Sequence, residues 1–210
     1  MVDNSWCRRR LLPAATVQSV DEGLALATAM MAGGLDVVEI TFRTPVAADA
    51  IREIAAQFPD MAVGAGTVLD TEQLDAAIDA GASFAVSPGL NPDVVRHAQR
   101  RDFLLMPGVI TAGEIDHAIR LGCRQLKFFP AEVSGGTKLL SALAGPFAHT
   151  GVTFLPTGGI TPDIAPSYLV LPFVAAVGGS WMVNADLIAT GQWEQITQLC
   201  RNAVALAADY

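Results

Sequence analysis

The lysine at position 127 has the setting in this sequence that most directly indicates chemistry. It lies in the apolar run 126–130 (LKFFP), where a surface ammonium group is not normally placed, and the chain has one other lysine, Lys138. Burial disfavours the charged form of an amine, and a neutral amine can attack a carbonyl carbon to form a Schiff base. A lysine that serves only the fold, through an ion pair or by extending its amine to the surface, is the alternative interpretation.

A carboxylate and a guanidinium occur at alternating positions of a second apolar segment. Glu39, Thr41 and Arg43 have the spacing of side chains that point to one side of a β-strand. A carboxylate there can transfer protons, and an arginine can bind a substrate carboxylate through two parallel hydrogen bonds. A structural ion pair between Glu39 and Arg43 explains the same pattern without a substrate. Thr67, after the next predicted strand, is a candidate ligand only because of these neighbours, since a threonine there usually serves a turn or a cap.

Two glycine pairs follow the last two predicted strands. Gly158-Gly159 and Gly178-Gly179 start 20 residues apart, which is about one β–α repeat, and Ser180 follows the second pair. In many α/β barrels the backbone N–H groups of such turns bind phosphate, because glycine allows close approach and a helix N-terminus favours an anion. Each pair alone is explained by a tight turn, whereas both together favour a phosphate site.

Other catalytic schemes find little support in the sequence. His97, His117 and His149 lie in predicted helices or loops without the spacing of metal ligands, so we expect no metal site. Ser87 has no GxSxG context, and Cys123 has no histidine partner at a strand end. A nucleophilic hydrolase is therefore not favoured.

The composition is typical of one globular domain covering residues 1–210. The 210 residues are 51% apolar, which excludes a disordered chain. The 13 basic against 21 acidic residues give no net attraction to phosphate backbones, so we expect no nucleic-acid partner. Cys7, Cys123 and Cys200 are scattered and form no CxxC pair, which favours a reducing compartment, and we expect a cytoplasmic protein.

The uncharged stretch 164–184 is long enough to span a bilayer at about 20 residues. Pro166, Pro172 and the pair Gly178-Gly179 interrupt it, however, and its apolar segment 173–177 is typical of a strand buried on both faces. The sequence therefore predicts no membrane span.

Short apolar segments alternate with helical patterns over the whole length. We predict eight strands, at residues 11–16, 37–42, 61–65, 84–87, 103–106, 125–129, 153–155 and 173–177. We predict helices at 20–32, 46–57, 71–80, 92–100, 112–121 and 193–208, with others after Gly135-Gly136 and near 161–168. Asn91-Pro92 and Thr161-Pro162 are typical of helix starts.

Repeated β–α units predict parallel strands with right-handed crossovers, and eight units can close into a (β/α)₈ TIM barrel. An open doubly wound sheet is the alternative, but no GxGxxG follows the first strand. In a barrel the active site is built at the carboxyl ends of the strands, where the candidate residues all occur.

Six segments of the sequence resemble the motifs of one enzyme family, 2-dehydro-3-deoxy-6-phosphogluconate (KDPG) and 4-hydroxy-2-oxoglutarate (KHG) aldolase. The resemblance extends over nearly the whole chain. The segments are 38–44 (VEITFRT), 63–69 (VGAGTVL), 87–89 (SPG), 127–132 (KFFPAE), 156–160 (PTGGI) and 178–181 (GGSW). In the first strand, residues 12–17 (LPAATV) are smaller than the aliphatic or arginine side chains of relatives.

The resemblance implies a class I aldolase with a (β/α)₈ fold, a homotrimeric assembly and no cofactor apart from a covalent imine on Lys127. It implies that Lys127 forms the Schiff base, that Glu39 shuttles protons, and that Arg43 and Thr67 bind the carboxylate of a 2-keto acid. The other implied substrate contacts are phosphate on Gly158, Gly159, Gly179 and Ser180, orientation by Thr157, and a pocket wall from Pro88 and Phe129.

The implied reaction is cleavage of KDPG to pyruvate and glyceraldehyde 3-phosphate. KHG, cleaved to pyruvate and glyoxylate, or the galactonate epimer of KDPG remains open as the main substrate, although Thr157 favours the gluconate form. Two further alternatives remain open from the residues alone. One is a barrel enzyme that acts on sugar phosphates without a covalent intermediate, and the other is a binding protein for sugar phosphates.

Overall fold

The strands form where short apolar runs separate the helical patterns. The structure, a computed structural model, describes residues 8–210, so Cys7 lies outside the described part of the chain. Within this part the strands pair in parallel throughout. They are β1 Leu11–Ala15, β2 Val37–Thr41, β3 Ala62–Gly66, β4 Phe84–Val86, β5 Leu105–Met106, β6 Gly108–Val109, β7 Gln125–Phe128, β8 Thr153–Pro156 and β9 Val177–Gly179.

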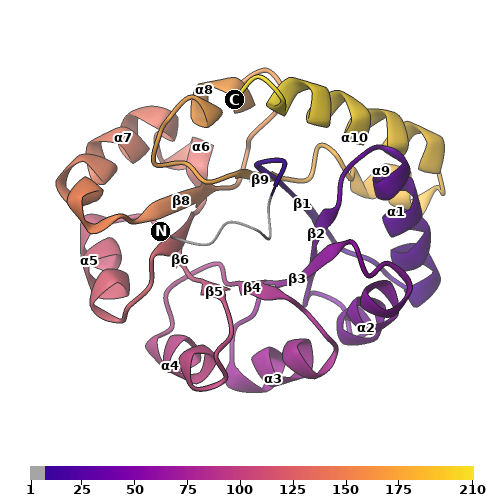
Figure 1. Ribbon diagram of the computed structural model, residues 1–210, viewed down its shortest axis with the longest axis horizontal. Helices are drawn as coiled ribbons and strands as arrows, with labels where there is room; N and C mark the ends of the chain where they lie inside the picture. The colour runs from indigo at the N-terminus through magenta and orange to yellow at the C-terminus, as the bar shows by residue number, and fades with distance from the viewer. Residues whose placement is uncertain (1–7) are drawn as a thin grey trace.

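The strands form two parallel sheets that helices surround (Figure 1). One sheet has the order β5-β4-β3-β2-β1-β9 and the other β6-β7-β8. Two single bridges, Phe154 to Val174 and Thr157 to Gly178, join β8 to the segment that ends in β9. The predicted α/β fold with a parallel sheet is confirmed. One continuous eight-stranded barrel is not, because Pro107, which has no N–H to donate, lies between β5 and β6.

Two predicted strands differ from the observed ones, and one observed strand was not predicted. The strand predicted at 103–106 begins only at Leu105, because the N–H of Phe103 is used by Ala98 at the end of a helix. Strand β6 was missing from the prediction, since two residues after a proline carry no readable alternation. The strand predicted at 173–177 is wrong: a turn in which Val174 bonds back to Leu171 delays β9 to Val177.

The helices are α1 Val20–Ala32, α2 Ala47–Gln57, α3 Thr71–Asp79, α4 Pro92–Arg100, α5 Ala112–Arg120, α6 Ala131–Ser134, α7 Gly136–Phe147, α8 Ala165–Leu169, α9 Ala185–Ala189 and α10 Trp193–Ala207. Side-chain caps set several starts, and Asn91 caps α4 as predicted. The start predicted at Thr161-Pro162 is wrong, because a turn comes first and α8 begins at Ala165. Short α9 was not predicted.

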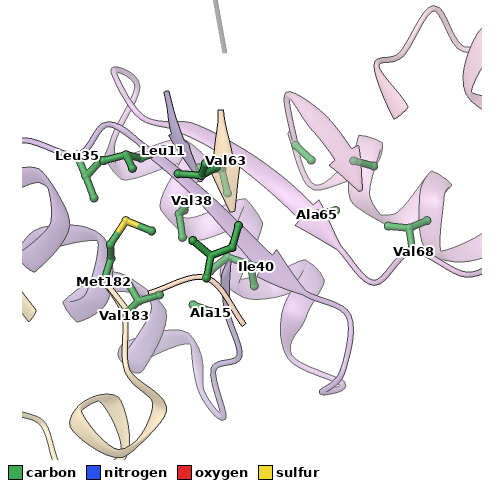
Figure 2. Packing of buried hydrophobic residues seen from close by; sticks show 14 of the residues in the cluster. Leu11, Ala15, Leu35, Val38, Ile40, Val63, Ala65, Val68, Met182 and Val183 are labelled. Carbon is green, nitrogen blue, oxygen red and sulfur yellow. The ribbon is translucent and has the colours of Figure 1, made fainter. Parts of the chain in front are cut away.

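Alternation along the strands separates two hydrophobic cores. Val38 and Ile40 of β2 belong to the main core, together with side chains of β1, β3 and the segment after β9 (Figure 2). Buried residues of the surrounding helices belong to the same core. Val37 belongs to a second, inner cluster on the opposite face of the same strand. The other members of the inner cluster are Leu12, Phe84, Val86, Met106, Leu155 and Ala176. Glu39 and Thr41 share the face of Val37, so they point into the interior enclosed by the strands.

The uncharged stretch 164–184 folds into α8, β9 and the turns around them. Among residues 8–210, none of the helices has both the length and the apolar character that crossing a membrane requires.

Candidate active site

The amine of Lys127 lies beside the carboxylate of Glu39 in the interior of the fold. Lys127 is on β7 and Glu39 on β2, so the two residues come from different sheets. Lys127 Nζ is 3.5 Å from Glu39 Oε1, and the two side chains are 8% and 2% exposed. Each charge compensates the other, since either one buried alone would carry a large desolvation cost. A lysine whose amine reaches the surface is excluded by this burial.

The second carboxylate oxygen of Glu39 is an unused acceptor. Glu39 Oε2 is buried and has no hydrogen-bond donor within residues 8–210. A buried acceptor without a donor costs about 1–3 kcal/mol, and native folds keep few of them. Glu39 can therefore hold the amine of Lys127 with one oxygen and exchange a proton with a bound molecule through the other.

Gly66 on β3 provides the space that the Glu39 side chain occupies. A Cβ atom at position 66 would lie 2.1 Å from Glu39 Oε1, which is closer than nonbonded atoms approach. Thr41 pairs with Gly66 in the parallel register, so the glycine faces the same interior. This role of Gly66 was not predicted, although a glycine on the strand beside an inward-pointing carboxylate indicates it once the register is known.

We expect Gly66→Ala to displace the Glu39 carboxylate from Lys127. A misplacement of about 1 Å can cost about 10²-fold in rate, so borohydride-trapped adduct formation with pyruvate should slow by about that factor. The matched control is Gly113→Ala on α5, where no atom lies within 4 Å of an added Cβ. An unchanged adduct rate in a folded Gly66→Ala protein would show that the space beside Glu39 is not needed.

An aromatic ring lies next to Lys127, and a proline lies against the neighbouring strand. Its Nζ is 5.3 Å from the centroid of the Phe129 ring, within the range of a cation–π contact. Gly108 pairs with Lys127 in the sheet, and a Cβ at Gly108 would lie 2.1 Å from the carbonyl oxygen of Pro88. Both Pro88 and Phe129 are half-buried. The Phe129 ring therefore lies beside the amine, and the Pro88 carbonyl lies against the residue that pairs with Lys127.

Arg43 lies beyond the end of β2 with an exposed side chain. Over residues 8–210 it takes part in no hydrogen bond or ion pair, and Glu39 pairs with Lys127 instead. The alternative of a structural ion pair between Glu39 and Arg43 is therefore wrong. The guanidinium of Arg43 is available to an anionic group.

Thr67 has a strained backbone. Its φ of +58° lies in the left-handed region, which a β-branched residue rarely adopts and which costs about 1–3 kcal/mol. The surrounding strands impose this conformation: Phe42 donates to Gly66 on one side, and Val68 donates to Val86 on the other. Such strain is concentrated at functional sites, and here it fixes Thr67 directly after the glycine that contacts Glu39.

The two glycine turns lie side by side. The bridge between Thr157 and Gly178 joins them, and Gly158 and Gly159 have φ values of +102° and +79°, which glycine adopts most readily. The N–H groups of Gly159 and Ser180 find no acceptor in the described part of the chain. These backbone donors suit an anion, while Gly179 is buried beside them.

Thr157 is buried, and its hydroxyl points toward Gly178. A Cβ at Gly178 would lie 2.3 Å from Thr157 Oγ1, so this glycine admits the threonine side chain. The hydroxyl oxygens of Thr16 and Thr41 lie 2.7 Å apart at the ends of β1 and β2. Neither Gly178 as a spacer nor the Thr16–Thr41 contact was predicted, because both depend on the register of neighbouring strands.

The histidines lie away from this site. His97 bonds to Asp75 at 3.0 Å between α4 and α3, and that hydrogen bond is the main cause that lowers the pKa of the Asp75 carboxyl. Residues 8–210 contain no group of three or more histidine, cysteine or acidic side chains arranged to hold a metal ion.

A parallel α/β fold that buries an amine beside a carboxylate, with anion donors on neighbouring turns, defines the class of enzymes that bind a carbonyl substrate covalently through lysine. Comparison with known proteins specifies the family. The family model for KDPG and KHG aldolase matches residues 2–199. The chain belongs to this family, and the resemblance of its six sequence segments is confirmed.

Individual relatives agree with this assignment. The KHG/KDPG aldolase of Escherichia coli is 44% identical over 194 residues, covering 92% of this chain and 90% of the relative. The KDPG aldolase of Legionella pneumophila, solved with pyruvate as a covalent carbinolamine, has a TM-score of 0.90 at 38% identity and covers 95% of this chain and 97% of its own. The Zymomonas mobilis KDPG aldolase, solved with 3-phosphoglycerate, has a TM-score of 0.88 at 42% identity and covers 97% and 95%.

Proposed function

We propose that this protein is a class I aldolase that cleaves KDPG to pyruvate and glyceraldehyde 3-phosphate. The observation that carries the proposal is the buried pair of Lys127 Nζ and Glu39 Oε1 at 3.5 Å. The covalent carbinolamine in the Legionella relative supports imine chemistry for the family. Side chains supply both the nucleophile and the proton transfer, so the reaction needs no metal or organic cofactor.

The first half of the reaction forms the imine. Lys127 first passes a proton to Glu39, and its neutral amine then attacks the C2 ketone and gives a carbinolamine. Glu39 donates a proton to the carbinolamine hydroxyl, which leaves as water while the nitrogen lone pair forms the protonated imine. The Glu39 carboxylate that results is then ready to accept a proton.

The second half breaks the carbon chain. Glu39, directly or through a water molecule, takes the proton of the C4 hydroxyl as the C3–C4 bond breaks. The electrons of that bond move to the imine nitrogen, leaving an enamine and releasing glyceraldehyde 3-phosphate. Protonation at C3 gives the pyruvate imine, and hydrolysis releases pyruvate and the free amine of Lys127.

The remaining candidate residues bind the two ends of the substrate. Arg43 and Thr67, at the ends of β2 and β3, bind the keto-acid carboxylate. Thr157 orients the substrate between the strands, and Pro88 and Phe129 form the wall around the imine. The phosphate binds the turns with unused N–H groups, which contain Gly158, Gly159, Gly179 and Ser180. The 3-phosphoglycerate in the Zymomonas relative supports a phosphate subsite in the family.

Replacement of Arg43 by glutamine should raise the KM for KDPG and leave kcat nearly unchanged. A hydrogen bond to a charged group contributes about 1.5–3 kcal/mol, so the expected rise in KM is about 10-fold to 10²-fold. Arg96→Gln, an exposed arginine on α4, is the matched control for charge. Equal KM values for the wild type and Arg43→Gln would remove Arg43 from the substrate site.

The substrate itself is tested with a panel of three compounds. KDPG, its galactonate epimer and KHG are each supplied to the purified protein, and pyruvate release is followed with a coupled dehydrogenase. We expect the highest kcat/KM for KDPG. A higher value for KHG, which the name of the Escherichia coli relative includes, would make KHG the main substrate. No pyruvate from any of the three would favour a non-covalent enzyme or a binding protein.

The proposal also includes a closed barrel, a homotrimeric assembly and a cytoplasmic location. The two bridges between β8 and the β9 segment support closure of the strands into one (β/α)₈ barrel. Family membership supports a homotrimer, which light scattering of the purified protein tests. Cys123 and Cys200 are free thiols, which suits work in the cytoplasm.

A further inference from the structure

A buried tyrosine and a glutamate form a polar pair that the proposed mechanism does not use. Tyr168 on α8 is fully buried, and its hydroxyl donates a hydrogen bond to Glu132 Oε1 on α6. Figure 1 shows these two short helices next to each other beside β8. Burial, and then the Glu132 carboxylate, raise the pKa of the Tyr168 hydroxyl, so it remains a donor. A satisfied hydrogen bond between a buried phenol and a carboxylate makes the structure around both side chains more rigid.

The backbone around Glu132 holds the turn that carries the unused N–H groups. Glu132 N–H donates to the carbonyl oxygen of Gly158 at 3.1 Å, and Ala131 N–H donates to that of Thr157 at 2.8 Å. A third backbone bond of the turn runs from Thr157 N–H to the carbonyl oxygen of Phe128, at 3.0 Å. The end of β7 and α6 therefore hold one side of the turn, and the bridge from Thr157 to Gly178 holds the other.

Glycines bring this turn and the polar pair into close contact. A Cβ at Gly159 would lie 2.9 Å from Glu132 Cβ, so the turn packs directly on the glutamate side chain. A Cβ at Gly136 would lie 3.2 Å from Glu132 Oε1 and 3.5 Å from the Tyr168 hydroxyl. Glu132 thus contacts the turn through its backbone and its Cβ atom, while the hydroxyl of Tyr168 holds its carboxylate.

The tyrosine also fixes the position of a negative charge. Glu132 is half-exposed and lies beside the N–H groups that we assign to phosphate. A carboxylate free to move there would repel a phosphate dianion and compete for the same donors. The hydrogen bond from Tyr168 holds the carboxylate toward α8, away from the N–H groups that we assign to phosphate.

We propose that Glu132 and Tyr168 are positioning residues for the Thr157–Gly158–Gly159 turn and thereby set the preference of the enzyme for phosphorylated substrates. This inference rests on the proposed function, because it takes the turn as the phosphate subsite. It assigns no part in imine chemistry to either residue.

Tyr168→Phe tests the inference, since it removes the hydroxyl and keeps the buried ring. We expect the KM for KDPG to rise about 10-fold, the cost of one hydrogen bond to a charged group, with little change in kcat. The kinetics of KHG, which has no phosphate, should stay at wild-type values. Tyr210→Phe is the control, because Tyr210 is the other tyrosine and is exposed. Glu132→Gln, whose amide oxygen still accepts the hydroxyl proton, should retain a low KM, whereas Glu132→Ala should behave like Tyr168→Phe.

Two results would overturn the inference. Unchanged KM values for KDPG in Tyr168→Phe would show that the pair does not position the turn. Equal losses on KDPG and KHG, with a lower melting temperature, would show a role in stability alone. If the wild type cleaves none of these substrates, the proposed function fails, and titration with inorganic phosphate then tests the pair: weaker binding to Tyr168→Phe than to the wild type supports it, and equal binding contradicts it.

Discussion

Lys127→Ala is expected to lower the rate of KDPG cleavage by about 10⁴-fold or more. The substitution removes the nucleophile on which the covalent route depends, and no other amine of the described chain is buried beside a carboxylate. The other lysine, Lys138 on α7, is exposed, so Lys138→Ala should keep full activity and serves as the matched control. Because alanine leaves Glu39 buried without its partner, Lys127→Met, which fills the same space, is measured alongside, with thermal melting of both variants.

The same lysine is located directly by chemical trapping. Incubation with pyruvate and borohydride reduces an imine to a stable amine, and intact mass followed by peptide mapping identifies the residue. We expect one adduct, on Lys127, in the wild type and in Lys138→Ala, and none in Lys127→Met. An adduct on Lys138 alone, or wild-type cleavage without Lys127, would contradict the covalent mechanism and favour a non-covalent barrel enzyme.

Glu39→Gln should slow cleavage by about 10² to 10⁴-fold, the usual contribution of a positioned acid–base group. Glutamine keeps the shape of the side chain and an oxygen that can face Lys127 Nζ, but it cannot exchange a proton at either terminal atom. We therefore expect a reduced kcat for KDPG and a slower approach to the same final adduct on Lys127. Stopped-flow measurement of imine formation and steady-state pyruvate release test the two steps separately.

An exposed glutamate supplies the control for this substitution. Glu53 on α2 lies at the surface, so Glu53→Gln changes the same charge away from the site and should have wild-type rates. Wild-type kcat in Glu39→Gln would show that another group moves the protons. The buried, unused Oε2 atom of Glu39 would then need a different explanation.

Local periodicity was sufficient to predict the parts of the fold that determine the site. Alternation along residues 37–42 placed Glu39 on the inner face of a strand, and the apolar run around Lys127 placed the amine in the interior. The Asn91 cap predicted the start of α4 for the same reason, since the signal lies within a few residues of its effect, whereas the similar pattern at Thr161-Pro162 did not start a helix.

Other features depend on contacts between distant residues, which a single sequence does not contain. At Pro107 the chain stops pairing with β4 and begins to pair with β7, which divides the sheet. The sequence does not reveal this division, because a proline among apolar residues is equally compatible with a strand end. The space that Gly66 leaves for Glu39 follows from the register of β2 and β3. The hydrogen bond between Tyr168 and Glu132 joins residues 36 positions apart on two helices too short to show a pattern.

The division of the sheet at Pro107 also divides the chemistry of the chain. The half before this proline carries Glu39 and the half after it carries Lys127, and β9 returns from the second half to pair with β1 of the first. Neither half holds a nucleophile and a proton carrier at once, so each would be inert by itself. The rate of turnover therefore depends on how precisely the two halves pack together. A small separation of the halves would abolish activity while most helices and strands were still intact.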